Sequence, residues 1–159
     1  MTTRLPTRSR LVAEALAAAG VQTEIRELPD SARTAAEAAA ALGCEVAAIA
    51  NSLVFVSGGE PLLVMTSGGH RVDTALLAER LGLGPIERAT AKQVREATGQ
   101  AIGGVAPTGH PAPLRTVVDT ALAEHPLVWA AAGTPHTVMP LTFDELLRVT
   151  GGTPTRVIS

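Results

Sequence analysis

Two apolar segments in the middle of the chain, residues 51–57 (NSLVFVS) and 61–67 (PLLVMTS), are separated only by Gly58, Gly59 and Glu60. Short runs rich in Val, Leu and Phe that are joined by glycines predict an antiparallel β-hairpin. Because both strands are apolar, we expect the hairpin at the centre of the sheet. A central antiparallel pair excludes a purely parallel, doubly wound sheet.

Short helices and short strands alternate on both sides of this hairpin. Capping residues, apolar positions at helical spacing and closing glycines predict helices at 7–19 (capped by Thr7 or Ser9), 34–43, 73–82, 90–99 and 142–151, with a helical turn at 44–50. Alternating or apolar runs predict further strands at 21–28, 114–119, 126–133 and 155–159. With 46% hydrophobic residues in 159, we expect one α+β (mixed α/β) domain over residues 1–159, a mixed central sheet flanked by short helices.

Composition limits the partners and the location of the chain. A net charge of −2, two Phe, one Trp and no Tyr argue against DNA and against a broad RNA footprint, because phosphates need cations and bases need stacking partners. No run approaches the 18 apolar residues of a membrane helix, and the start MTTRLPTRSR lacks the apolar core of a signal peptide. We therefore expect a cytoplasmic protein that contacts no membrane. One cysteine, Cys44, excludes an internal disulfide.

Residues 101–111 (AIGGVAPTGHP) concentrate glycine, proline and histidine between more ordinary segments. Gly103 and Gly104 allow a close backbone approach, and Pro107 stiffens the chain that follows. This pattern suits a preorganised set of amides for a carbonyl or oxyanion, and it suits a tight turn equally well. A phosphate-binding P-loop is disfavoured, because no Gly-Lys-Ser or Gly-Lys-Thr follows.

Other polar residues give weaker signals. None of the four histidines has metal-ligand spacing to another histidine or to Cys44, so we expect no metal and no cofactor. His110 follows Gly109 and can line a pocket, while His70 and His136 lie in loops. Asp119 closes a predicted strand and can orient a loop through hydrogen bonds.

The order of these segments resembles the YbaK/EbsC family, relatives of the editing domain of bacterial prolyl-tRNA synthetase. The resemblance runs from about Leu11 to Gly151 and rests on IANSLVF, HRVDTALLAERLG, IGGVAPTGH and GTPHTVMPLTFDELLRVTG in that order. It implies a mixed sheet flanked by helices. It also implies hydrolysis of mischarged aminoacyl-tRNA, with the aminoacyl-tRNA 3′ end as partner.

The family's Gly-x-x-x-Pro loop corresponds to residues 103–107. The resemblance implies that Gly103 and Gly104 present amides to the ester carbonyl while water attacks, and that a pocket admits a small amino acid on tRNA(Pro) or a related tRNA. The substrate contacts it implies are Ser52, Val105, Ala106, Pro107, Gly109, His110 and His136.

Asn51 departs from the family pattern, in which many members have a lysine ahead of the Ser or Thr of this strand. Lys92 is the only lysine and lies on another predicted helix. Asn51 can still bind substrate through neutral hydrogen bonds, and we expect it to face the same pocket as the 101–111 loop. Two functions stay open: an aminoacyl-tRNA deacylase, or a catalytically weakened module that holds a small ligand or an aminoacyl-tRNA 3′ end. The sequence is compatible with a monomer and with a weak homodimer.

Overall fold

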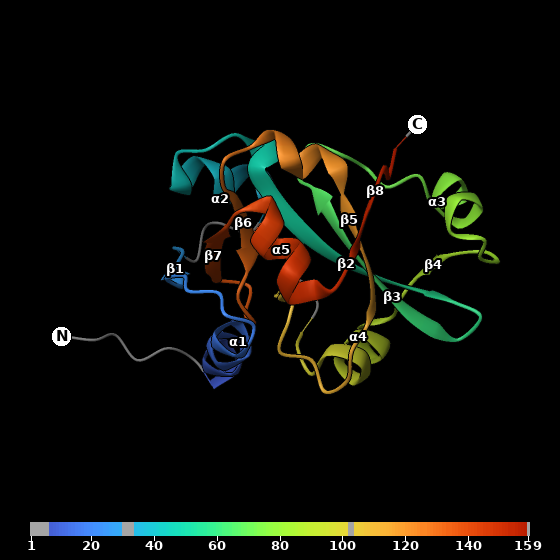
Figure 1. The fold of residues 1–159 in the computed structure, drawn as a ribbon, viewed down its shortest axis with the longest axis horizontal. Helices are drawn as coiled ribbons and strands as arrows, with labels where there is room; N and C mark the ends of the chain where they lie inside the picture. The colour runs from blue at the N-terminus through green and yellow to red at the C-terminus, as the bar shows by residue number, and fades with distance from the viewer. Residues whose placement is uncertain (1–6, 30–33, 102–103, 159) are drawn as a thin grey trace.

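The computed structural model describes residues 7–29, 34–101 and 104–158, and it has the mixed α+β fold that the sequence predicts (Figure 1). The α-helices in these ranges are α1 (Thr7–Ala18), α2 (Ala35–Leu42), α3 (Thr74–Leu81), α4 (Ala91–Thr98) and α5 (Phe143–Thr150), with 3₁₀ turns η1 (Val46–Ala48) and η2 (Thr120–Glu124). The strands are β1 (Arg26–Glu27), β2 (Ile49–Ser57), β3 (Glu60–Ser67), β4 (Glu87–Arg88), β5 (Arg115–Asp119), β6 (Val128–Ala131), β7 (Thr137–Leu141) and β8 (Thr153–Thr155). No helix in these ranges has the length and apolar character needed to cross a membrane.

All of these strands join one sheet in the order β1-β7-β6-β2-β3-β5-β8, with β4 paired to β2. The predicted hairpin is confirmed: β2 and β3 are antiparallel, Ser57 pairs with Glu60, and Gly58 and Gly59 both have positive φ. Such φ values match the right-handed twist of the flanking strands. The pairs β2–β6, β3–β5 and β5–β8 are parallel. The sheet is therefore mixed, with the hairpin at its centre.

The second edge of β2 is only partly paired. β6 pairs with Ile49 and Ala50 at the start of the strand, and β4 pairs with Phe55 and Val56 further along. Between these two pairings, residues 51–53 have no strand beside them on this edge in the part of the chain that the structure describes. This gap in the sheet is where the candidate site lies.

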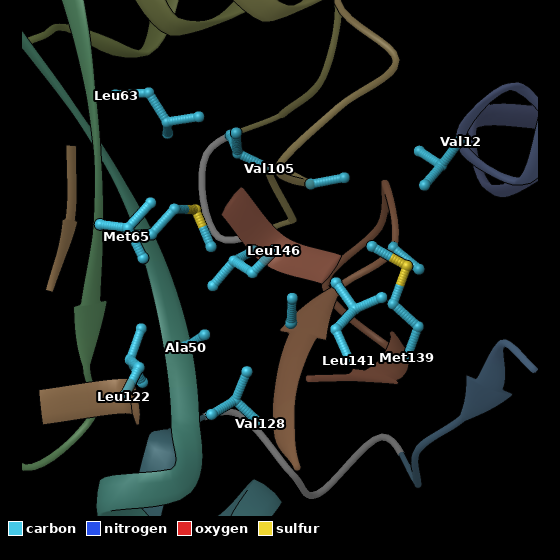
Figure 2. Packing of buried hydrophobic residues seen from close by; sticks show 14 of the residues in the cluster. Val12, Ala50, Leu63, Met65, Val105, Leu122, Val128, Met139, Leu141 and Leu146 are labelled. Atoms are coloured by element: carbon cyan, nitrogen blue, oxygen red, sulfur yellow. The ribbon is translucent and has the colours of Figure 1, made fainter. Parts of the chain in front are cut away.

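Side chains of β2 alternate between two layers, as a strand requires. Ala50 and Val54 pack into the largest core cluster, which includes Leu146 of α5. Leu53 packs on the opposite face with the cluster around Leu77 of α3, and Ile49 packs with the small cluster that includes α2. Figure 2 shows members of the largest cluster, with Met65, Val105 and Leu146 close together between the hairpin and α5.

The helix caps were predictable from local sequence. In each of four helices a side-chain oxygen accepts a hydrogen bond from the backbone N–H three residues later, as capping requires; the capping residues are Thr34, Asp73, Thr90 and Thr142. Ser9 is an exception, since α1 already begins at Thr7. Ser9 is buried within this helix and its hydroxyl hydrogen-bonds to that of Thr137 at 3.1 Å.

The strand predictions were less accurate near the ends of the chain. Within the predicted strand 21–28 only Arg26 and Glu27 pair, and the terminal strand is Thr153–Thr155 instead of 155–159. β7 was missed because Pro140 argues against a strand. The strand tolerates Pro140 because β1 pairs only with Thr137 and Val138, so no strand among the described residues needs a hydrogen bond from position 140 on that side. The Pro140 carbonyl accepts a 2.6 Å hydrogen bond from the Thr23 hydroxyl.

Candidate functional site

A pocket of about 320 Å³ opens at the gap beside β2. It is bounded by β2, by α2, by β6 and β7, and by the segment that follows Gly104. Its lining residues are Leu28, Thr34, Ala35, Ala38, Ile49, Ala50, Asn51, Ser52, Leu53, Val54, Arg88, Val94, Val105, Trp129, Ala131, Pro135, Thr137 and Val138. The lining is mostly apolar with a few polar side chains, and no Asp or Glu of the described residues belongs to it, an arrangement typical of small-molecule sites.

β2 supplies the polar residues that the sequence singled out. Asn51 and Ser52 are half-buried neighbours, so their side chains leave the strand on opposite faces. Ser52 faces the core, where its hydroxyl donates to the sulfur of Met65 at 3.2 Å, a weak acceptor. Asn51 shares the other face with its cross-strand partner Thr66. Because this stretch of β2 has no neighbouring strand on one edge, both residues reach the same pocket.

Gly104 is held by a close backbone approach. A Cβ at this position would lie 2.5 Å from the carbonyl carbon of Thr134 and 2.7 Å from the nitrogen of Pro135. The Gly104 N–H donates to the Ala101 carbonyl at 3.0 Å, so this amide is already engaged. Gly104 therefore packs the loop against the segment before β7. Its neighbour Val105 is buried and lines the pocket.

Gln100 braces the rest of this loop from within. Its side-chain oxygen accepts a 2.7 Å hydrogen bond from the Ala106 N–H, and its side-chain nitrogen donates to the Thr108 carbonyl at 3.3 Å. Gln100, Ala106 and Pro107 are all buried. The bracing role of Gln100 was missed because nothing in the sequence distinguishes a bridging glutamine from a solvent-exposed one.

His110 folds back onto the same loop. Its Nε2 lies 2.8 Å from the Ala106 carbonyl, which makes Nε2 the protonated nitrogen of the neutral ring. Burial lowers the pKa of His110, and the hydrogen bond to Ala106 opposes this shift only partly. Gly109 has φ of 85° and lies against Val12 of α1. Among the predicted substrate contacts, Ala106, Pro107, Gly109 and His110 thus lie behind the pocket lining.

The segment before β7 forms the opposite wall through Pro135 and Thr137. The Thr137 hydroxyl is held by those of Thr134 at 2.8 Å and Ser9 at 3.1 Å. His136, between the two wall residues, is outside the lining, and its Nδ1 is buried without a hydrogen-bond partner in the described part of the chain.

A cation reaches the pocket from a strand that the sequence did not predict. Arg88 lies on β4, which pairs with β2 through Phe55, and its guanidinium stands 5.7 Å from the centre of the Phe55 ring. The two-residue β4 is too short to produce a strand pattern in the sequence, and the pairing with β2 is a long-range contact. No local signal could have placed Arg88 in the pocket that Asn51 lines.

Asp119 and His70 form a second polar cluster that does not line this pocket. Asp119 is 1% exposed and its Oδ2 lies 2.8 Å from His70 Nδ1. The same carboxylate accepts hydrogen bonds from the N–H groups of Ser67 and Ala121 and from the Thr66 hydroxyl. The prediction that Asp119 orients a loop is confirmed. Within residues 7–29, 34–101 and 104–158, no three His, Cys, Asp or Glu side chains gather as a metal site would require.

Among the predicted site residues, the structure brings Asn51, Ser52 and Val105 to one pocket. Gly103, the other predicted amide donor, is outside the described residues. The structure therefore does not test whether Asn51 and Gly103 face one pocket. It shows this for Asn51 and Val105, which lies two positions after Gly103 in the same loop.

Comparison with known proteins gives consistent matches. The profile of the aminoacyl-tRNA editing domain matches residues 29–149. A crystal structure of a proposed trans-editing enzyme for prolyl tRNA synthetase superposes with a TM-score of 0.93 at 43% identity, covering 98% of this chain and 99% of that one. YwhH of Bacillus subtilis, an uncharacterized protein, is 28% identical over 79% of this chain and 80% of its own length. The proline–tRNA ligase of Bacillus licheniformis is 36% identical over 57% of this chain, a match that spans only 17% of the ligase.

Proposed function

Because the chain belongs to the aminoacyl-tRNA editing domain family, whose members act on aminoacyl-tRNA, we propose that it hydrolyses the ester of mischarged tRNA in trans. The proposed substrate is a small amino acid on tRNA(Pro) or a related tRNA. The observation that carries the proposal is the pocket at the β2 gap, where Asn51 and Val105 meet although more than fifty residues separate them. The resemblance to a proposed trans-editing enzyme over nearly the whole chain supports the same substrate class.

In the proposed reaction, a water oxygen attacks the ester carbonyl carbon and the bond from this carbon to the ribose oxygen breaks. A proton passes from water to the ribose oxygen, and a free amino acid and tRNA are released. The aminoacyl ester is already activated, so positioning and oxyanion stabilisation can supply much of the rate. The Gly104 and Ala106 amides are engaged inside the loop. We therefore propose that oxyanion stabilisation comes from the amide of Gly103, the other donor that the resemblance to the family loop implies.

The pocket lining favours an uncharged, small amino acid. Within residues 7–29, 34–101 and 104–158, the charged side chain that lines the pocket is that of Arg88, which would repel a lysine or arginine side chain of a substrate. Ala35 and Ala38 of α2 and Ala50 and Ala131 of the sheet leave room without offering polar partners. The side-chain oxygen of Asn51 is the proposed acceptor for the substrate's amino group or a ribose hydroxyl, because the hydroxyls of Thr34 and Thr137 already hydrogen-bond within the protein.

A panel of mischarged tRNAs incubated with the pure protein tests this function. Release of a small uncharged amino acid, faster than the spontaneous rate, is the expected result. Saturable binding of a mischarged tRNA without release of its amino acid would instead support the catalytically weakened module. The replacement of the family lysine by Asn51 also allows that function.

Asn51 provides a matched pair of variants. Loss of one neutral hydrogen bond in Asn51→Ala should weaken turnover or binding by about 0.5–1.5 kcal/mol. Asn51→Lys adds a flexible point charge to a pocket shaped around an amide, so we expect it to lose activity as well. A gain of deacylation in Asn51→Lys would show that the natural protein is a weakened enzyme. Unchanged behaviour of both variants would remove Asn51 from the site.

A further inference from the structure

Two arginines are stacked on aromatic rings at this pocket. Arg26 on β1 stands 5.1 Å from the centre of the Trp129 ring, and Arg88 on β4 stands 5.7 Å from the Phe55 ring. The whole chain has only three aromatic residues of the Phe, Trp and Tyr types, and two of them carry an arginine. Trp129 and Arg88 themselves line the pocket.

Neither arginine is neutralised by a carboxylate in the described part of the chain. Contacts within 4 Å between a carboxylate and a basic nitrogen join Lys92 to Glu96, His70 to Asp119 and His125 to Glu45 there, and none of these contacts involves Arg26 or Arg88. The acidic neighbours Glu27 and Glu87 follow and precede the two arginines directly on their strands, so they leave the sheet on the opposite face. Both arginines are exposed. Their charges are thus available to a ligand from solvent.

Stacking on an aromatic ring orients an arginine for ligand binding. A guanidinium over an aromatic face is held in a defined plane, while its N–H groups at the edge remain able to donate to two oxygens of a phosphate at once. A lysine would not be oriented in this way, because its ammonium is a point charge on a flexible stem.

The two cations flank the pocket from the two ends of the gap along β2. β4 pairs with the far half of β2, whereas Trp129 on β6 pairs with Ile49 at its beginning, and β1 lies beyond β6 and β7 in the sheet order. Both β6 and β4 lie on the edge of β2 that β3 does not occupy, one at each end of the gap at residues 51–53. A single-stranded RNA whose 3′-terminal nucleotide enters the pocket can therefore place a backbone phosphate near each arginine.

We propose that Arg26 and Arg88 bind backbone phosphates of the single-stranded RNA 3′ end whose terminal ribose enters the pocket. This inference rests on the proposed function and names how the same site holds its substrate. With a net charge of −2, the protein as a whole does not attract RNA, so affinity must come from local cations of this kind. Arg88 also adds a positive charge to the pocket that Asn51 lines.

Binding of a short single-stranded RNA ending in CCA, measured at several salt concentrations, tests the proposal. We compare the wild type with Arg26→Gln, Arg88→Gln and the double variant. The control is Arg80→Gln, an exposed arginine on α3, a helix that contributes nothing to the pocket lining. Each lost phosphate contact should lower the slope of log affinity against log salt by about 0.7. Affinity at low salt should fall about tenfold or more per arginine, the scale of a charge-assisted hydrogen bond.

A second measurement separates this proposal from the function on which it rests. Hydrolysis of a mischarged tRNA is compared with hydrolysis of a 3′-aminoacyl adenosine, which has no phosphate. The arginine variants should lose about tenfold more activity on the tRNA than on the adenosine ester, by the same charge-assisted scale.

The outcomes are distinct. Equal RNA affinity and salt slope in the arginine variants and Arg80→Gln, or no RNA binding by the wild type, would overturn the phosphate site even if esters are hydrolysed. Loss of RNA binding in the variants without hydrolysis of either ester would support the phosphate site and refute the deacylase.

Discussion

Replacing Gly104 by alanine tests whether the loop and the opposite wall of the pocket are held by direct backbone contact. The new Cβ would lie 2.5 Å from the Thr134 carbonyl carbon, 2.7 Å from the Pro135 nitrogen and 2.8 Å from the Thr134 Cα. Carbon atoms pack at about 3.5–4.0 Å, so one of the two backbones must move by about 1 Å. No rotamer change can relieve a clash between a Cβ and backbone atoms.

We expect Gly104→Ala to destabilise the fold by about 1–3 kcal/mol, the usual cost of overpacking. The displaced segments carry Val105 and Pro135, which form opposing walls of the pocket. Since a misplacement of about 1 Å at a reacting centre can cost about 100-fold in rate, deacylation should fall more than the stability loss alone explains.

Urea unfolding and single-turnover deacylation, both at a temperature where the variant is folded, provide the measurements. Gly84→Ala is the matched control, because a Cβ there meets nothing within 4 Å and its φ lies outside the left-handed region. It should leave activity intact and stabilise the protein by about 0.4–1 kcal/mol through the unfolded chain. If Gly104→Ala is as stable and as active as Gly84→Ala, the contact with Thr134 does not shape the pocket.

Two further predictions concern buried polar groups. Asp119→Ala leaves buried donors without their acceptor and should cost at least about 1–3 kcal/mol in urea unfolding, the penalty for one unsatisfied buried group. Glu124→Ala, at an exposed neighbouring position, should change stability by less than about 0.5 kcal/mol, and an equally small effect of Asp119→Ala would contradict the anchoring role. Burial lowers the pKa of His110 in the folded protein, so below the ordinary histidine pKa of about 6.5 the unfolded chain binds more protons at this residue. The stability that depends on a neutral His110 is therefore fully present above about pH 6.5 and is lost as the pH falls below it. The wild type should lose more stability than His110→Gln between pH 7.5 and pH 5, and parallel profiles would refute this.

Local sequence was sufficient for the features that depend on neighbouring residues. The glycine turn between β2 and β3 and the capped starts of α2 to α5 follow from side chains within four residues of each feature. These same features explain why the mixed sheet with a central hairpin was predictable. The predicted loop at 101–111 was also recognisable, because glycine and proline restrict or release the backbone wherever they occur.

The missing parts of the site depend on contacts between distant segments. The gap along β2 exists because β6 and β4 pair with its two ends and neither pairs with residues 51–53. Arg88 and Trp129 enter the pocket only through these pairings. The engaged amide of Gly104 and the bridging role of Gln100 likewise depend on tertiary placement, which no local pattern encodes.

An NMR titration tests most directly whether the substrate occupies the pocket beside β2. A 3′-aminoacylamido adenosine, in which an amide replaces the labile ester, is titrated into ¹⁵N-labelled protein. We expect the largest amide shifts at Ser52, Leu53, Val105 and Thr137, together with the side-chain amide of Asn51. Shifts concentrated instead around the separate cavity lined by Leu62, Leu83 and Leu114, or no shifts at saturating analogue, would contradict the assignment of this pocket as the editing site.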